Sequence, residues 1–162
     1  MALQKIVNID PALGVPGSQA TFYNEVTTLN NYISNGTVQA GKFVFDGTAG
    51  INTTGSSQKI ASLTAAPGTA PVGLCVRLVD GILADGVDAS LTYVRGCNVT
   101  VAIRGDFYVL AEGTAAVGDS VNVDPATGAV TYGVADGGAI STGFTVAQGG
   151  SLGDVIVISN HG

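Results

Sequence analysis

The sequence predicts an all-β protein: a single small β-sandwich or β-barrel-like domain with an extended N-terminal arm. Three observations lead to this fold class. The chain has 162 residues, which is the length of one domain. Val and Ile together outnumber Leu, and β-branched side chains pack well on a pleated surface. The 24 glycines, about twice the usual share, separate short apolar runs as turn residues do.

The first 36 residues differ from the rest, and we predict an arm over residues 1–36 followed by a β-domain over residues 37–162. Pro11 and Pro16 restrict their own backbone and push the preceding residue towards extended conformations. Residues 1–17 are therefore expected to form an extended segment rather than a core strand.

Residues 18–36 leave two interpretations open. With Ser18 as a possible N-cap and Gly36 as a stop, apolar side chains recur at helix-like spacing, at Phe22, Val26, Leu29 and Ile33. However, Thr and Asn are frequent in the same segment, and both are poor helix formers. An irregular segment is the favoured interpretation, and a short helix is the alternative.

From residue 38 onwards, short strands alternate with turns. The predicted strands cover residues 38–46, 59–63, 72–79, 91–95, 97–103, 107–111, 120–124, 129–132, 144–147 and 154–159. Gly96 predicts a bulge or bend between two of them. The Arg-Gly-Asp sequence at residues 104–106 predicts a hairpin turn.

Two features of the C-terminal part are more specific. Pro125 presets its own φ and Gly128 accepts a positive φ, so residues 124–128 are predicted to close a hairpin. The Val-Ile-Val-Ile run at residues 155–158 is apolar on both faces. This run predicts a strand that is buried between two layers.

The charge content restricts the possible partners. Only 11% of the residues are charged, against about 25% in an average domain. This indicates assembly, because charged residues are depleted where partner chains cover a surface. The net charge is −6, and the six Lys and Arg residues stand singly along the chain. They cannot form a phosphate-binding stripe, so neither nucleic acid nor an anionic membrane is expected as a partner.

No apolar run reaches the length of a signal peptide core or of a membrane span. The protein is therefore expected to be made and kept in a cytoplasm, or to be released by lysis.

Candidate catalytic residues are few, and we predict that the protein is not an enzyme and holds no metal or cofactor. The single histidine, His161, is expected to be an exposed tail residue that could not support a catalytic triad. Cys75 and Cys97 are predicted to be buried thiols. A disulfide between them stays open if their strands are neighbours.

Two further patterns are weak. Residues 113–120 have the glycine spacing of a phosphate-binding loop, but Asp119 stands where that loop needs a lysine. Asp80, Asp85 and Asp88 share one turn region, and their spacing does not match a calcium loop. We expect solvated turn carboxylates there, with a weak cation site as the alternative.

The order of short glycine-containing motifs along the chain is more informative than any one of them. The motifs are Val7-Asn8-Ile9 with Pro11 and Gly14, Gly17-Ser18-Gln19-Ala20, Val38 with Gly41-Lys42-Phe43-Val44-Phe45, Pro71-Val72-Gly73-Leu74, Gly105-Asp106-Phe107-Tyr108-Val109, Ala116-Val117-Gly118-Asp119-Ser120-Val121 and Ser141-Thr142-Gly143-Phe144. This order resembles the structural cement (head decoration) proteins of tailed bacteriophages. The resemblance spans most of the chain, and residues 18–36 depart from it.

The resemblance implies a structural role in the virion. Cement proteins are small β-rich domains with an N-terminal arm, and they commonly sit as trimers at three-fold positions on the outside of the head. They clamp neighbouring major capsid subunits against the internal pressure of the DNA. The expected partners are therefore the major capsid protein and other copies of the chain. The expected location is the outer capsid surface, after assembly in the host cytoplasm, and the family has no catalytic residues to transfer.

The arm is the expected contact element. Its candidate contact residues, towards a capsid subunit or a neighbouring protomer, are Val7, Ile9, Pro11, Leu13 and Pro16. An extended arm can add backbone hydrogen bonds to the exposed edge of another sheet. The alternatives are another virion component, such as a tail or fibre base, and the less favoured small-ligand-binding β-module.

Overall fold

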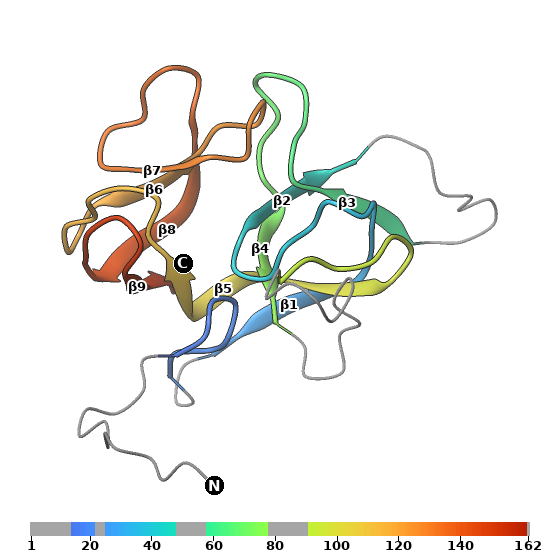
Figure 1. Ribbon diagram of the computed structural model, residues 1–162, viewed down its shortest axis with the longest axis horizontal. Helices are drawn as coiled ribbons and strands as arrows, with labels where there is room; N and C mark the ends of the chain where they lie inside the picture. Colours follow the sequence, from blue (N-terminus) through green and yellow to red (C-terminus); the bar gives the residue numbers. More distant parts are fainter. Residues whose placement is uncertain (1–13, 22–24, 48–57, 78–90, 162) are drawn as a thin grey trace, which may run out of the picture.

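The computed structural model describes residues 14–21, 25–47, 58–77 and 91–161, which contain nine strands and no helix (Figure 1). The strands are β1 (Thr27–Ser34), β2 (Phe43–Asp46), β3 (Lys59–Ser62), β4 (Gly73–Val76), β5 (Asn98–Leu110), β6 (Ser120–Val123), β7 (Val130–Tyr132), β8 (Ile140–Gln148) and β9 (Val155–Asn160). The predicted all-β class is confirmed. Because these residues contain no helix, no helix that could cross a membrane is found among them.

The first part of the fold is a closed barrel of five strands. β1 pairs with β3 in parallel, and the pairs β3–β2, β2–β4, β4–β5 and β5–β1 are antiparallel, so the ring returns to its starting strand. Closure leaves no open strand edge in this part, which removes a site for unwanted strand pairing.

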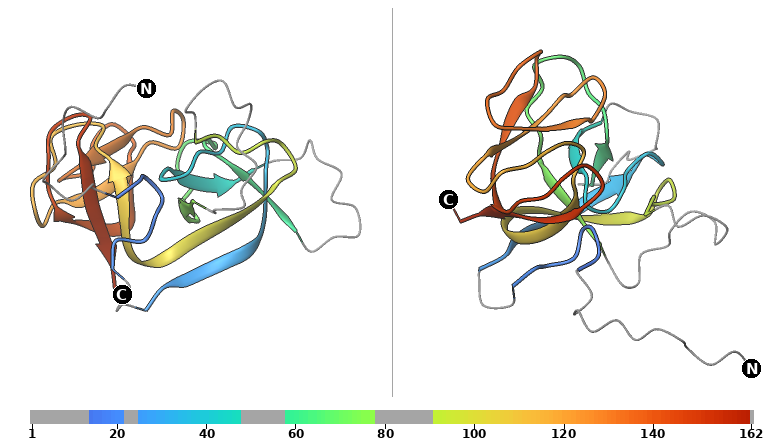
Figure 2. Two further views of the ribbon diagram at one scale, coloured as in Figure 1. Left: turned by 60° about the horizontal axis from the view of Figure 1, so that its bottom comes forward. Right: turned by 60° about the vertical axis from the view of Figure 1, so that its left-hand side comes forward.

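The second part is an open antiparallel sheet in the order β5-β9-β8-β6-β7. β5 belongs to both parts: its first half closes the barrel, and its second half, from Gly105, pairs with β9. Gly105 has a φ of 124°, which a residue with a side chain rarely adopts, and it lies where the strand leaves the barrel. The long bent strand is visible between the two parts in Figure 2.

Two apolar clusters follow from the period-2 alternation of the strands. Val44 and Cys75 belong to the cluster inside the barrel. Their neighbours on the opposite face, among them Phe43 and Leu74, join a larger cluster with the second sheet. The rings of Phe43 and Phe144 meet edge-to-face at a centroid distance of 5.6 Å and connect the two parts.

Several predictions of individual elements are wrong. Residues Thr27–Ser34 form strand β1 instead of an irregular segment or a helix, because they pair with both β3 and β5 and so close the barrel. Residues 104–106 form no hairpin turn, because β5 runs through them without interruption. Residues 91–95 make only isolated bridges.

Other predictions are confirmed. Residues 124–128 connect the antiparallel strands β6 and β7, with Gly128 at a φ of 73°. Strand β9 lies in the predicted place, but only Ile156 and Ile158 are fully buried, because its other face is half covered.

The two cysteines are free thiols, Cys75 buried and Cys97 half-buried. Cys75 lies in β4 and Cys97 directly precedes the neighbouring strand β5, but Cys75 faces Val101 in the register of the two strands. Cys97 lies four residues before Val101, about 13 Å at roughly 3.3 Å per residue. A disulfide needs Cα atoms within about 7 Å, so this register excludes it.

Candidate functional site

The described base of the arm, residues 14–21, forms an isolated antiparallel bridge with the second half of β5. The N–H groups of Gly17 and Ala20 donate to the carbonyls of Tyr108 (2.7 Å) and Asp106 (2.8 Å). In the opposite direction, the Tyr108 N–H donates to the Ser18 carbonyl at 3.0 Å. The pairing is antiparallel, and it covers the edge of β5 that β9 leaves open. The arm base is therefore hydrogen-bonded to the domain at this point.

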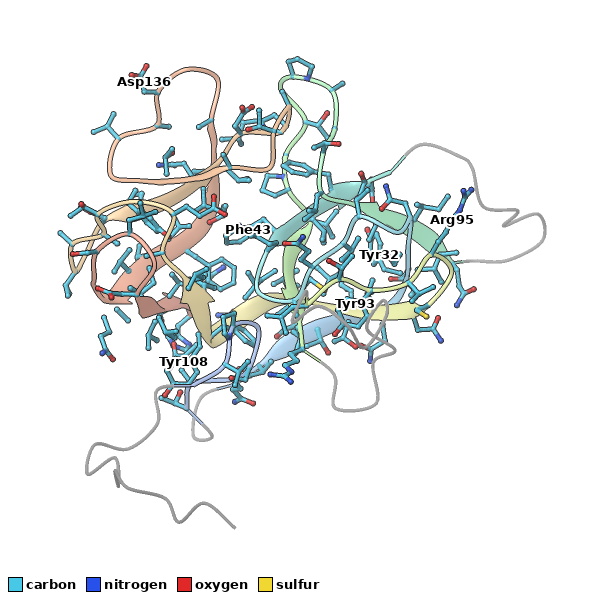
Figure 3. All side chains as sticks on the ribbon, viewed as in Figure 1. Tyr32, Phe43, Tyr93, Arg95, Tyr108 and Asp136 are labelled. Carbon is cyan, nitrogen blue, oxygen red and sulfur yellow. The ribbon has the colours of Figure 1, made fainter. Side chains whose placement is uncertain are left out.

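Glycines allow the arm base to lie flat against the domain. A Cβ on Gly17 would lie 2.7 Å from the backbone nitrogen of Gly41, closer than real Cβ contacts. A Cβ on Gly14 would overlap the ring of Tyr108, which Figure 3 shows beside the arm. The Gly17 carbonyl also accepts the Arg77 N–H at 2.8 Å, so the arm base connects β5 with the end of β4.

Of the five predicted contact residues, only Pro16 lies in the described part. Val7, Ile9, Pro11 and Leu13 lie outside it, and their contacts remain predictions. Pro16 is half-buried and precedes Gly17 in a tight turn. A shallow groove runs beside it, lined by Pro16, Gln39, Ala40, Gly41, Lys42, Leu91 and Leu110.

Asp106 connects the arm base with the C-terminal tail. Its carboxylate is buried and accepts the Thr21 hydroxyl at 2.6 Å, while Nε2 of His161 lies 2.6 Å from its other oxygen. The Arg104 guanidinium in turn donates to the carbonyl of His161. The prediction of a solvent-exposed tail histidine is confirmed, since the imidazole is 45% exposed, but its Nε2 also contacts the Asp106 carboxylate, which the sequence did not predict.

An ion pair connects the barrel with the open sheet. Lys42, just before β2, pairs with Glu112, just after β5. The second carboxylate oxygen of Glu112 accepts the N–H of Val130 on the edge strand β7 at 2.5 Å. Partial burial lowers the pKa of the Lys42 ammonium.

Six tight turns with one design recur along the described chain. They cover residues 15–18, 39–42, 66–69, 94–97, 116–119 and 151–154, and in each the fourth N–H donates to the first carbonyl. The third residue is always a glycine with a φ between 80° and 92°, as a type II turn requires. We did not predict this set from the sequence. The Pro-Gly pairs at residues 16–17 and 67–68 could have predicted two of these turns, because proline favours the second position and glycine the third. A glycine without a preceding proline does not predict such a turn.

Metal-ligating side chains do not cluster in the described part. No group of three or more His, Cys, Asp or Glu residues there is arranged to hold a metal ion. Within residues 113–120, the Asp119 carboxylate accepts the Ala116 N–H at 2.9 Å, so it closes a turn. Asp80, Asp85 and Asp88 lie outside the described residues.

Comparisons with known proteins agree on one class. A family described as "Structural cement protein (E217 gp24/Pam3 gp6)" matches residues 3–160. Among solved structures, the fold is similar to a chain in "The capsid of Myoviridae Phage XM1", with a TM-score of 0.58, 16% identity and 99% of each chain covered. It is also similar to the head fibre gp8.5 N base of bacteriophage phi29, with a TM-score of 0.51, 13% identity, and 84% of this chain and 94% of that chain covered. No curated protein matches the chain.

Proposed function

The chain belongs to the structural cement protein family of phages, and from this premise we propose that it binds the outer surface of the phage head and stabilises contacts between major capsid subunits. The family is structural, so the chain is a component of the virion. The proposal extends this to the surface that is bound, to the capsid partner and to assembly in the host cytoplasm.

The pairing of the arm base with β5 is the observation that supports the proposal most directly. Three backbone hydrogen bonds and the contact between Gly17 and Gly41 fix residues 17–20 against the domain, a short distance in sequence after residues 1–13. Any pull on those residues therefore reaches the folded domain. Such a segment suits attachment to a neighbouring subunit through strand addition, with Val7, Ile9, Pro11, Leu13 and Pro16 as the contact residues.

We further propose that the protein acts as a trimer. Three linked copies engage several subunits at once, which raises avidity by roughly 10²–10⁴ without stronger individual contacts. The low content of charged residues is compatible with surfaces that other chains cover.

Binding to undecorated heads tests the proposal. The full chain is compared with a variant that lacks residues 2–13 and keeps the whole paired arm base. We expect the variant to keep the thermal unfolding temperature of the full chain and to bind heads at least tenfold more weakly. Equal binding by both proteins would exclude the arm as the contact element. The trimer would be excluded if light scattering gave the free protein a mass near one chain and the copies bound to heads were also single.

The fold likeness to a head fibre base supports a second candidate, a base that holds a fibre on the head. Electron microscopy of decorated heads separates the two. A cement protein is expected at every three-fold position, whereas a fibre base is expected to carry additional density that projects outwards.

A further inference from the structure

Two of the six glycine turns, residues 116–119 and 151–154, are built alike and are called the twin turns below. Each has an apolar second residue, a glycine third and an aspartate fourth. In each, the aspartate Oδ2 accepts the N–H of the first residue of the turn, that of Ala116 at 2.9 Å and that of Ser151 at 2.8 Å. The same side-chain bond therefore closes both turns.

The twin turns lie side by side at one end of the open sheet. Ala115 and Gly150, which precede them, exchange two backbone hydrogen bonds of 2.9 and 3.0 Å. A Cβ on Gly149 would overlap the carbonyl oxygen of Ala115, so the two loops touch along their backbones. Figure 1 shows them together, one following β5 and the other connecting β8 to β9.

Their tips are apolar and exposed. Val117 is 71% exposed and Leu152 is 72% exposed, whereas most large apolar side chains of the described residues are covered. A single exposed apolar residue is ordinary in a folded protein. Here two of them stand on adjoining turns that glycine and aspartate already hold in place. A pre-ordered tip loses little conformational freedom on binding, which is a property of good interface contacts.

The part of the sequence that carries the tips has charges of one sign. Residues 1–104 contain six Lys or Arg and six Asp or Glu, whereas residues 105–162 contain six Asp or Glu and neither Lys nor Arg. The sequence that forms most of the open sheet therefore accounts for the whole net charge of −6. Since residues 1–104 have no net charge, a second copy offers no basic half to match it. The complementary charge has to come from another protein.

We propose that the twin turns dock onto a protein surface that offers an apolar recess rimmed by Lys and Arg side chains. The inference rests on the proposed function, under which this surface belongs to the capsid lattice. It adds a second contact to the arm, and it orients the molecule with the loop end of its open sheet towards the lattice. The apolar tips supply contact area, and the surrounding carboxylates guide the approach and discriminate against acidic surfaces.

A paired substitution tests the docking surface. Val117→Ser and Leu152→Ser are combined in the full chain, where both side chains face solvent and the turn bonds stay intact. The matched control is Val94→Ser, an exposed apolar residue in the glycine turn at residues 94–97 of the barrel part. Binding to undecorated heads is measured for the wild type and both variants at low and high salt. Light scattering gives the mass of each free protein.

We expect the control to bind like the wild type and the paired variant to bind at least tenfold more weakly with an unchanged mass. Wild-type binding should also weaken as salt screens the charges. Wild-type affinity in the paired variant would overturn the inference and leave the proposed function in place. A lower mass of the paired variant would also overturn it, because the tips would then face a second copy. If the wild type itself does not bind heads, the proposed function fails and the capsid lattice is excluded as the partner.

Discussion

The imidazole Nε2 of His161 lies 2.6 Å from the Asp106 carboxylate, so the second-to-last residue of the chain meets the strand that also holds the arm base. The same carboxylate accepts the hydroxyl of Thr21. One buried side chain therefore contacts segments from both ends of the chain.

Removal of the Asp106 carboxylate should weaken the attachment of both the arm base and the C-terminal tail to β5. We expect Asp106→Ala to lower the free energy of unfolding by about 1–3 kcal/mol, because it deletes a buried acceptor with two partners. His161→Ala should cost less than about 1 kcal/mol, since the imidazole is 45% exposed. Urea unfolding of both variants measures the difference. Equal losses would show that the histidine, and not the carboxylate, is the main contributor.

Gly17 and Gly68 form a matched pair for the arm base. Both are third residues of a Pro-Gly turn, with φ values of 83° and 85°, but only Gly17 has neighbours within reach of a Cβ. Gly68→Ala should lower the free energy of unfolding by about 1–2 kcal/mol, because alanine is strained in the left-handed backbone conformation. Gly17→Ala should cost about 1–3 kcal/mol more through overpacking against Gly41. Thermal unfolding tests this, and equal losses would mean that the close approach to Gly41 contributes nothing.

The two thiols should differ in reactivity. Burial raises the pKa of Cys75 to about 12, so its reactive thiolate is scarce at neutral pH. Cys97 is half-buried and accessible. We expect one thiol per chain to react with a maleimide in the native protein and the second to react only in denaturant. A Cys97→Ser variant should show no native labelling, and rapid labelling of that variant would contradict the burial of Cys75.

The turn that joins β6 to β7 should contribute to stability in a pH-dependent way. The Thr127 hydroxyl and then the Ala126 N–H donate to Asp124 and hold its pKa below the ordinary value of 3.8. A depressed folded pKa means that the contribution is complete above the unfolded pKa and is lost as the pH falls through the folded value. The difference in unfolding temperature between the wild type and Asp124→Asn should therefore shrink below about pH 4. A difference that is constant down to pH 2 would contradict the assignment.

The pair of Lys42 and Glu112 should couple the barrel to the open sheet. Glu112→Gln leaves the partly buried Lys42 ammonium without its counter-charge. It should therefore lower the free energy of unfolding more in the wild type than in a Lys42→Met background. A double-mutant cycle with urea unfolding should give a coupling of about 1 kcal/mol. Additive effects of the two substitutions would mean that the ion pair contributes no net stability.

The sequence-based predictions succeeded where the cause is local and failed where it is tertiary. The strands around residues 124–128 follow from proline, glycine and alternating apolar residues close in sequence. Strand β1 was missed because its partners, β3 and β5, are distant in sequence and its own Thr and Asn content is ambiguous. Gly105 was interpreted as a turn residue because a glycine that bends a continuous strand has the same local signal.

In the candidate site too, the sequence predicts local features but not contacts between distant residues. Pro16 is identified from its effect on the backbone, and its position within the arm base is compatible with that prediction. The contact between Gly17 and Gly41, the pairing of His161 with Asp106 and the adjoining turns of Val117 and Leu152 each join residues distant in the chain. The sequence contains no local signal for such contacts.

The antiparallel pairing of the arm base with β5 has a mechanical consequence. A load on the arm reaches this pairing through the tight turn at residues 15–18, and the part of the load that acts along residues 17–20 is at right angles to their hydrogen bonds with β5. The bonds of Gly17, Ser18 and Ala20 would then be sheared together, whereas bonds at the end of a peeled strand break one at a time. Because β5 continues into the barrel, the strain would spread through the strand shared by both parts of the fold. A protein held by its arm on a shell under outward pressure would resist in this loading direction.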